Sequence, residues 1–105
     1  MSRLLMLEDD LSLIDGLSYS LKKHGFETEV ARTVSEADSL WNSGKYDLLI
    51  LDVSLPDGSG FDVCKKVRQT SKVPIIFLTA SDEEVSMIMG LDMGADDYIT
   101  KPFKL

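Results

Sequence analysis

Hydrophobic positions along the chain alternate between continuous short runs and the three-to-four-residue spacing of helices. Residues 3–7, 47–52 and 73–79 contain continuous apolar runs, which are typical of strands buried on both faces of a parallel sheet. In residues 26–30 apolar side chains alternate with charged ones, which indicates an exposed edge strand, and residues 96–100 predict a fifth strand. The pattern therefore predicts five strands separated by other elements.

The segments between these strands carry apolar residues at helical spacing. The first helix is predicted from the helical spacing of Leu11, Ile14, Leu17 and Leu21. It is expected to end near His24 and Gly25, since glycine commonly follows a helix. The sequences TVSE (33–36) and SDEE (81–84) are capping-box patterns, in which a Ser or Thr side chain begins a helix. A further helix follows the turn sequence LPDGSG (55–60). Each strand except the last is therefore followed by a helix.

Strands that alternate with helices in this way predict an α/β fold with a parallel sheet and right-handed crossovers. With five strands we expect a flavodoxin-like, doubly wound five-stranded parallel sheet of order 2-1-3-4-5, with the fifth helix missing from the chain. The 105 residues suit one domain that spans residues 1–105. Ligands bind such folds beyond the carboxyl ends of the strands, at the switch between the first and third strands.

Carboxylates stand where two of the predicted strands end. Glu8, Asp9 and Asp10 follow the first strand, and Asp52 ends the third. Adjacent carboxylates repel one another, and a hard cation with oxygen ligands, Mg²⁺ above all, would relieve the repulsion. Because both strands end at the same edge of a parallel sheet, these acids would share one crevice. The sequence thus predicts a divalent-cation site.

Two further polar residues are expected in the same crevice. Thr79 ends the fourth strand and Lys101 follows the fifth, so a hydroxyl donor and a positive charge would face the carboxylates. Both suit the oxygens of a phosphoryl group. A carboxylate beside them can attack a phosphoryl donor and form an acyl phosphate. Asp52, at the end of the central strand, is the best candidate for this nucleophile.

Composition narrows the range of partners. The net charge of −7 argues against nucleic-acid binding by this chain, because phosphate neutralisation requires clustered Lys and Arg. No apolar run reaches the roughly 18 residues of a membrane span and no signal peptide is visible, so no membrane partner is expected. Cys64 is the single cysteine and cannot form an internal disulfide, which favours a cytoplasmic location.

Several polar or reactive residues also have a purely structural interpretation. Asp10 suits the N-terminus of a helix, where the helix dipole stabilises a negative charge, and Ser81 suits a helix cap. Cys64 shares a helix face with apolar residues and is expected in the core. His24 is expected on the surface at a helix end, and Trp41 is expected to serve packing.

Four segments together resemble the receiver domain of bacterial two-component response regulators: LEDD, LLILDVSLPDGSG, FLTA and GADDYITKPF. The resemblance covers essentially the whole chain, with the motifs in the order and spacing of that family. It implies a phosphorylation-dependent signalling switch in which Asp52 accepts a phosphoryl group from a sensor histidine kinase. It also implies that the chain is no turnover enzyme, although it catalyses its own phosphotransfer and autodephosphorylation.

The resemblance assigns metal-binding roles residue by residue. Asp9, Asp52 and the backbone carbonyl of Ser54 would be ligands of Mg²⁺, for which Mn²⁺ can substitute. Glu8 would act on the metal through a bound water. These assignments are inherited from the family, and they agree with the carboxylate cluster that the strand ends predict.

The resemblance also assigns roles around the phosphoryl group. Thr79 and Lys101 would contact its oxygens. Thr79 and Tyr98 would form the switch: when Thr79 moves toward the phosphoryl group, Tyr98 rotates into the space that it leaves. Ser54 and Ser81 lie two residues beyond Asp52 and Thr79, where they would tune the hydrolysis of the acyl phosphate.

GADDYITKPF is most similar to the OmpR/PhoB subfamily, whose members usually carry a C-terminal DNA-binding domain that regulates transcription. This similarity implies that DNA is contacted only through an effector domain missing from this chain, which would be a fragment of a longer regulator. It also implies a homodimer through the face made by the fourth helix and the fifth strand. Two departures bear on that dimer: Met89 stands where the subfamily usually has a basic residue, and the fifth helix is missing.

Other interpretations of the same residues stay open. One is a stand-alone receiver that acts by protein–protein contact, with a partner covering the sheet face that lacks its helix. Another is a phosphatase of the haloacid dehalogenase type, which also uses a strand-end aspartate and Mg²⁺ but needs a second acid where this chain has Ser54. A third is an interaction module that is never phosphorylated; such modules usually lose an acid or the lysine, and this sequence retains them.

Overall fold

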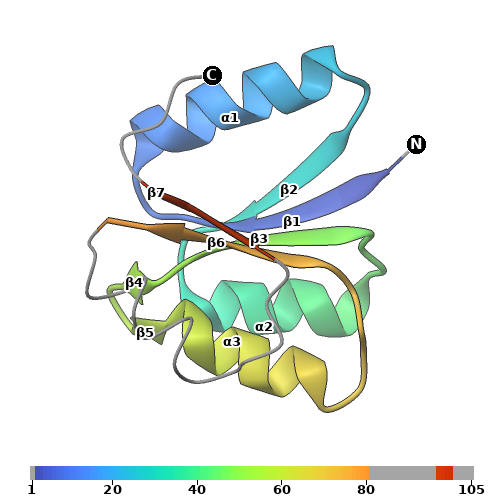
Figure 1. The fold of residues 1–105 in the computed structure, drawn as a ribbon, viewed down its shortest axis with the longest axis vertical. Coiled ribbons are helices and arrows are strands. Elements are labelled where there is room, and N and C mark those ends of the chain that lie inside the picture. The colour runs from blue at the N-terminus through green and yellow to red at the C-terminus, as the bar shows by residue number, and fades with distance from the viewer. Residues whose placement is uncertain (1, 81–96, 101–105) are drawn as a thin grey trace.

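The computed structural model describes residues 2–80 and 97–100, which form three layers (Figure 1). The elements in chain order are β1 (Arg3–Leu7), α1 (Leu11–Lys23), β2 (Glu27–Ala31), α2 (Val34–Ser43), β3 (Leu48–Asp52), β4 (Ser54–Leu55), β5 (Gly58–Ser59), α3 (Gly60–Arg68), β6 (Ile75–Thr79) and β7 (Asp97–Thr100). Within these ranges, five strands form one parallel sheet in the order β2-β1-β3-β6-β7. Because β4 and β5 form a separate hairpin, this is the predicted order 2-1-3-4-5, and the fold prediction is confirmed.

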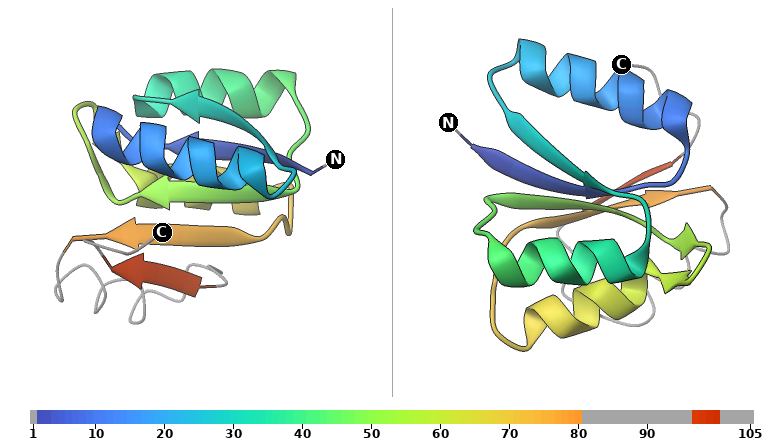
Figure 2. Two further views of the ribbon diagram at one scale, coloured as in Figure 1. Left: turned by 90° about the horizontal axis from the view of Figure 1, so that it is seen from above. Right: turned by 180° about the vertical axis from the view of Figure 1, so that it is seen from behind.

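Helices cover both faces of the sheet: α1 lies on one face, and α2 and α3 lie on the other (Figures 1 and 2). Alternate residues of a strand therefore face different helices. On β1, Leu5 and Leu7 belong to the larger core cluster beneath α2 and α3, whereas Leu4 and Met6 pack toward α1. Both faces of β1 are buried, which explains its continuous apolar sequence. None of the helices in the described ranges combines the length and apolar character needed to cross a membrane.

The first two helices use the terminal residues that the sequence indicates. Thr33 is the N-cap of α2, and its Oγ1 accepts the N–H of Glu36 at 3.1 Å. The Glu36 carboxylate accepts the N–H of Arg32 at 3.0 Å, one residue before the amide that a capping box normally uses. Gly25 has a φ of 88°, which explains why a glycine follows α1. The second predicted capping box, at 81–84, lies outside the described residues.

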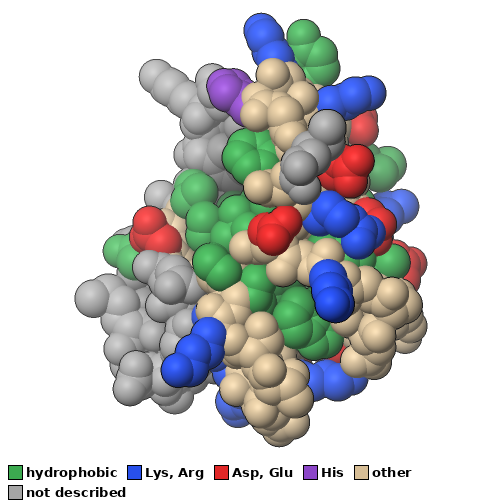
Figure 3. All heavy atoms as spheres, turned by 90° about the vertical axis from the view of Figure 1, so that its right-hand side faces the viewer, with side chains coloured by type: hydrophobic (Ala, Val, Ile, Leu, Met, Phe, Trp, Pro, Cys, Tyr) green, Lys and Arg blue, Asp and Glu red, His purple; other side chains and the backbone are tan. Residues whose placement is uncertain are grey.

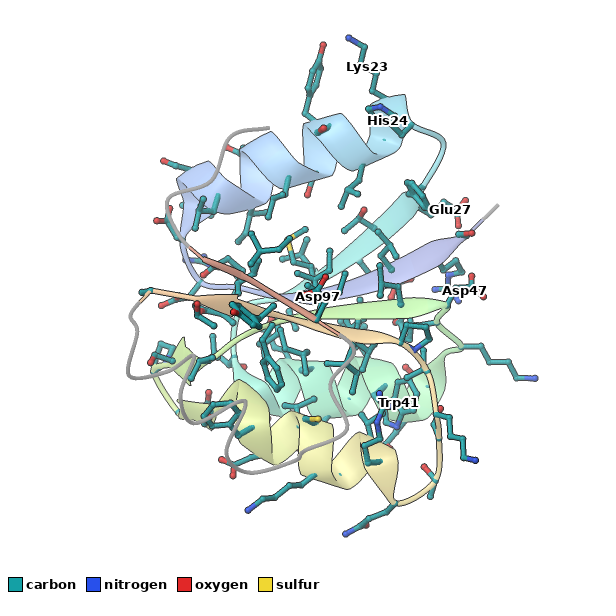
Figure 4. All side chains as sticks on the ribbon, viewed as in Figure 1. Lys23, His24, Glu27, Trp41, Asp47 and Asp97 are labelled. Atoms are coloured by element: carbon teal, nitrogen blue, oxygen red, sulfur yellow. The ribbon has the colours of Figure 1, made fainter. Side chains whose placement is uncertain are left out.

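Three of the structural interpretations are confirmed. Cys64 is buried in the larger core cluster, and Trp41 packs against that cluster with its ring stacked on Tyr46 at 6.4 Å. His24 is exposed at the C-cap of α1 (Figure 4). Leu11 differs from the predicted helix pattern, because it is 57 % exposed in the first turn of α1.

Charged side chains of both signs lie side by side at the amino ends of the strands (Figure 3). Arg3 on β1 forms a salt bridge with Glu29 on β2, and its guanidinium lies 5.1 Å from the centre of the Tyr46 ring. The Tyr46 hydroxyl donates to the Glu29 carboxylate at 2.6 Å, and the backbone N–H of Arg3 donates to the Asp47 carboxylate at 2.8 Å. This network joins β1, β2 and the segment before β3 at the end of the sheet opposite the carboxyl ends of the strands.

The Tyr46 hydroxyl makes the stability of the protein depend on pH in the alkaline range. Burial, and next the hydrogen bond to Glu29, raise the pKa of Tyr46 from 10.0 to about 12. The folded state therefore holds this proton more tightly than the unfolded chain does. The resulting stabilisation is complete below pH 10 and is lost as the pH rises toward 12.

We expect Tyr46→Phe to lower the free energy of unfolding by about 1 kcal/mol at pH 8, because the hydrogen bond to Glu29 is lost. Between pH 10 and 12 the variant should lose stability less steeply than the native chain, because no phenol titrates at this position. Urea unfolding at stepped pH values measures both effects. Tyr19→Phe is the matched control, since Tyr19 is 72 % exposed. Identical alkaline slopes for Tyr46→Phe and the native chain would contradict the prediction.

Candidate functional site

The carboxyl edge of the sheet brings together three acidic side chains from two strand ends. β1 ends at Leu7 and β3 at Asp52, and the two strands run parallel with Leu7 opposite Leu51. Carboxylate oxygens of Glu8, Asp9 and Asp52 lie within 4.8 Å of one another. The structure thus gathers these acids in one place, although more than forty positions of sequence separate the first two from the third.

Two of these three acids are buried. Glu8 is fully buried and Asp52 is 5 % exposed, whereas Asp9 is partly exposed. Ionised carboxylates at this separation repel one another, and the repulsion grows when burial removes the screening water. A donor set made only of carboxylate oxygens suits a hard divalent cation. The cluster, which we call the acidic cluster, could therefore hold a metal ion, and its residues fit Mg²⁺.

Backbone hydrogen bonds in the turn after β1 hold Glu8 in place. Its Oε2 accepts the N–H of Asp9 at 2.9 Å and the N–H of Asp10 at 3.2 Å. The N–H of Glu8 donates to the carbonyl of Ala31, at the end of β2, at 3.0 Å. One carboxylate oxygen of Glu8 therefore shapes the turn that presents Asp9. This arrangement is compatible with an indirect role of Glu8 in metal binding.

Asp10 serves the helix that follows it. It is the N-cap of α1, and its Oδ1 accepts the N–H of Ser12 at 2.9 Å and the N–H of Leu13 at 3.4 Å. Among the described residues, the group with metal-site geometry includes Glu8 and Asp9 but not Asp10. The structural interpretation of Asp10 is therefore confirmed.

Thr79 supplies a buried hydroxyl at the same edge of the sheet. It is the last residue of β6, and β6 pairs with β3 so that Leu78 lies opposite Asp52. Thr79 is fully buried, and its Oγ1 has no hydrogen-bond partner within the described part of the chain. A buried hydroxyl is costly unless it is hydrogen-bonded, so this oxygen is available to a further partner, and the predicted contact of Thr79 with a phosphoryl group stays a prediction.

Tyr98 shares a face of the sheet with Thr79. It lies on β7, next to β6, with Phe77 as its register partner. Because side chains two residues apart on a strand point the same way, Phe77, Thr79 and Tyr98 all point to one side of the sheet. Tyr98 is 36 % exposed, so its ring is not enclosed. Thr79 and Tyr98 thus lie on one side of neighbouring strands, and the switch between them stays a prediction.

The remaining predicted site residues are placed only in part. Ser54 lies in β4, two residues after Asp52, and its side chain is exposed. β4 pairs antiparallel with β5, so a short hairpin overlaps the predicted turn at 55–60. Lys101 and Ser81 lie outside the described residues. Their roles, like the metal-ligand role of Ser54, stay predictions.

The contacts of two residues near the site, Asp57 and Arg32, could not be predicted from the sequence. Asp57 accepts the N–H of Val34 at 2.8 Å and the N–H of Ser35 at 3.2 Å. The bond from Val34, followed by that from Ser35, holds the pKa of the Asp57 carboxyl below its ordinary value. Arg32 donates to the backbone carbonyl of Asp9 at 3.3 Å. These partners lie 22 or 23 positions apart in sequence, so no local spacing could reveal the contacts.

A half-open pocket of about 630 Å³ lies elsewhere, between the second half of α1 and β2. Its lining includes Ser18, Lys22, Phe26, Thr28 and Glu29, and it contains none of the predicted site residues. The carboxylates at the strand ends, rather than this pocket, therefore mark the candidate site.

Comparison with known proteins points to one family. Residues 4–105 match the family model of the response regulator receiver domain. The chain is 44 % identical over 103 residues to the sensory transduction protein RegX3 of Mycobacterium tuberculosis, covering 98 % of this chain and 45 % of the relative. It is 44 % identical over 101 residues to the uncharacterized transcriptional regulatory protein YclJ of Bacillus subtilis, covering 96 % of this chain and 44 % of the relative. The chain thus spans less than half the length of these curated relatives.

Solved structures agree with this match. A two-component response regulator from Clostridium difficile superposes with a TM-score of 0.90 at 33 % identity, covering 99 % of this chain and 86 % of that one. The response regulator TrrA from Thermotoga maritima, in complex with Mg²⁺–BeF, superposes with a TM-score of 0.88 at 33 % identity. That match covers 99 % of this chain and 90 % of TrrA.

Proposed function

The chain belongs to the response regulator receiver domain family, and from this premise we propose that it is a phosphorylation-dependent signalling switch. Asp52 accepts a phosphoryl group from the phosphohistidine of a sensor histidine kinase. The acyl phosphate then changes the conformation of the domain and controls an output. The protein is a switch rather than a turnover enzyme, although its own residues promote phosphotransfer and later dephosphorylation.

One observation carries this proposal. Asp52 lies within 4.8 Å of two other carboxylates, at the edge of the sheet where β6 presents the buried Thr79 hydroxyl. A nucleophilic carboxylate, a cation site and a hydrogen-bond donor are the components that phosphoryl transfer requires. Glu8, Asp9, Asp52 and Thr79 supply all three at one end of the sheet.

The transfer can be written in terms of the chain's own atoms. A carboxylate oxygen of Asp52 attacks the phosphorus, and a P–O bond forms as the P–N bond of the phosphohistidine breaks. The imidazole of the kinase leaves with the electron pair of that bond. Burial of Asp52 excludes water from the ionised carboxylate and so favours attack on a donor that enters the site. Water later cleaves the acyl phosphate and restores the carboxylate.

The metal requirement follows from the acidic cluster. We propose that Asp9, Asp52 and the carbonyl of Ser54 hold Mg²⁺, with Glu8 acting through water and Mn²⁺ as a substitute. When bound, Mg²⁺ would neutralise negative charge on the transferring group. The similar response regulator TrrA is a complex with Mg²⁺–BeF, which supports Mg²⁺ as the cation of this chain.

Contacts to the phosphoryl group would carry the signal. The Thr79 hydroxyl donates to a phosphoryl oxygen, and Lys101 supplies a positive charge. Tyr98, on the same face of the sheet as Thr79, moves inward as Thr79 moves toward the phosphoryl group. Ser54 and Ser81 tune the rate at which water removes the group. The phosphorylated state is thereby read out at β7, on the edge of the sheet.

The output is proposed from the relatives. YclJ is named a transcriptional regulatory protein and is more than twice as long as the matched region. We propose that this receiver acts in the cytoplasm within a regulator whose separate effector domain binds DNA. A net charge of −7 makes direct DNA contact by this chain unfavourable. A homodimer would form through β7 and the helix predicted before it.

Incubation with acetyl phosphate and Mg²⁺, followed by intact-protein mass spectrometry, tests the proposal. We expect one phosphoryl adduct per chain and no adduct when EDTA replaces Mg²⁺. Absence of any adduct in Mg²⁺ would contradict the switch and favour an inert interaction module. Continuous hydrolysis of assorted phosphate esters would contradict it in favour of a phosphatase.

A further inference from the structure

The N-terminus of α2 receives a carboxylate from a distant loop. Asp57 lies at the tip of the β4–β5 hairpin, and its two oxygens accept the N–H groups of Val34 and Ser35 at 2.8 and 3.2 Å. The first amides of a helix have no partner within the helix, so a carboxylate is a favourable acceptor for them. These two hydrogen bonds join the loop after Asp52 to the beginning of α2.

The cap formed by Asp57 is separate from the one formed within α2. Thr33 accepts the N–H of Glu36, whereas Asp57 accepts the two amides that precede Glu36. The two caps therefore do different things. Thr33 stabilises the helix end locally, and Asp57 holds the hairpin in place relative to that helix end.

Packing reinforces the attachment of the hairpin to α2. Gly58 has a φ of 157°, and a Cβ at this position would lie 3.3 Å from Cγ2 of Val34. The hairpin backbone thus lies directly against the side chain of Val34. Leu55, on the other strand of the hairpin, packs against the same core cluster as Val34. Ser54, whose carbonyl is a proposed metal ligand, precedes Leu55 in this anchored hairpin.

The segment at residues 31–35, which includes the beginning of α2, also holds the turn that carries Asp9. Arg32 donates to the Asp9 carbonyl at 3.3 Å, and the Ala31 carbonyl accepts the N–H of Glu8 at 3.0 Å. Residues 31–35 therefore contact both of the loops that carry proposed metal ligands. The separation of those loops depends on this shared support.

We propose that Asp57 is a positioning residue for the metal site, which it serves by fixing the β4–β5 hairpin on the N-terminus of α2. The inference rests on the proposed function, in that Ser54, Asp9 and Asp52 together hold Mg²⁺. Asp57 is neither a proposed ligand of the metal nor a proposed contact of the phosphoryl group. It sets the distance between the Ser54 carbonyl and the carboxylates of Asp9 and Asp52.

Mg²⁺ titration calorimetry on the native chain and three variants tests this role. Asp57→Ala removes both hydrogen bonds to α2, and we expect Mg²⁺ to bind about tenfold more weakly, at the low end for outer-shell partners of metal ligands. Asp57→Asn retains one acceptor oxygen, so its affinity for Mg²⁺ should lie between those of Asp57→Ala and the native chain. Thr33→Ala is the matched control, because it removes a cap of the same helix without touching the hairpin.

The urea midpoint in EDTA, measured on the same proteins, separates positioning from stability. We expect Thr33→Ala and Asp57→Ala to lower this midpoint to a similar extent, with only Asp57→Ala weakening Mg²⁺ binding. Equal Mg²⁺ affinities for these two variants would overturn the inference and reduce Asp57 to a helix cap. Failure of the native chain to bind Mg²⁺ would instead overturn the proposed function, and this inference with it.

Discussion

Asp52→Asn is expected to gain no phosphoryl group from acetyl phosphate under conditions in which the native chain gains one. An amide oxygen is a poor nucleophile, and the substitution also removes one of the carboxylates of the acidic cluster. Intact-protein mass spectrometry measures the loss directly. Asp15→Asn, on the exposed side of α1, is the matched control and should be phosphorylated like the native chain. An adduct on Asp52→Asn would contradict the assignment of Asp52 as phosphoacceptor.

The same variant should have a second property that a merely damaged protein would lack. Without divalent cations, Asp52→Asn relieves the repulsion among three clustered carboxylates, two of them buried. We therefore expect its free energy of unfolding in EDTA to exceed that of the native chain by about 1 kcal/mol. Mg²⁺ should stabilise the native chain more than the variant. Urea unfolding with and without Mg²⁺ measures both differences.

Gly60→Ala is expected to lower the free energy of unfolding by about 3 kcal/mol, at the upper end for overpacked positions. A Cβ on Gly60 would lie 2.1 Å from the backbone carbonyl oxygen of Asp52 and 3.0 Å from its carbonyl carbon. The N–H of Gly60 also donates to the Val53 carbonyl at 3.0 Å, which holds the start of α3 against the end of β3. Relief of the clash must therefore move α3 or the backbone of Asp52.

Gly25→Ala separates this clash from ordinary glycine effects. Gly25 has a φ of 88°, but a Cβ at this position would meet no described atom within 4 Å, so its replacement costs backbone strain alone, about 1 kcal/mol. Urea unfolding should rank Gly60→Ala well below Gly25→Ala in stability. Phosphorylation by acetyl phosphate should also be slower in Gly60→Ala, because the displaced backbone belongs to Asp52. Equal stability of the two variants would contradict the close approach of α3 to β3.

The strands were predictable because the burial of each strand produces a pattern of apolar and polar residues within a few positions of sequence. The run at 47–52 is apolar because β3 lies in the middle of the sheet and is covered on both faces, and 26–30 alternates because β2 lies at the edge. Thr33 and Gly25 mark helix ends through contacts within a few residues. These strand and helix-end preferences depend on residues close together in the chain, so they can be predicted from the sequence.

Other features needed the folded chain. The predicted turn at 55–60 overlaps the β4–β5 hairpin, and Asp57 of this hairpin accepts hydrogen bonds from amides of α2 more than twenty positions away. Arg32 reaches the Asp9 carbonyl over a similar separation. Leu11 has the spacing of a buried residue but lies exposed in the first turn of α1. Each of these outcomes depends on how elements approach one another, which periodicity does not encode.

By itself, the sequence determined the strand order, the positions of the acids at strand ends and the resemblance to the receiver domain. It also indicated that the acids meet, because parallel topology sends the carboxyl end of every strand to one edge of the sheet. Only the tertiary structure decided how closely the acids approach, since it places carboxylate oxygens of Glu8, Asp9 and Asp52 within 4.8 Å of one another and leaves Asp10 outside that group as a helix cap. It also decided which loops are fastened to α2. The physical reason is that carboxylate repulsion, helix capping and loop anchoring all act through distances of a few ångströms, which exist only after the strands have paired.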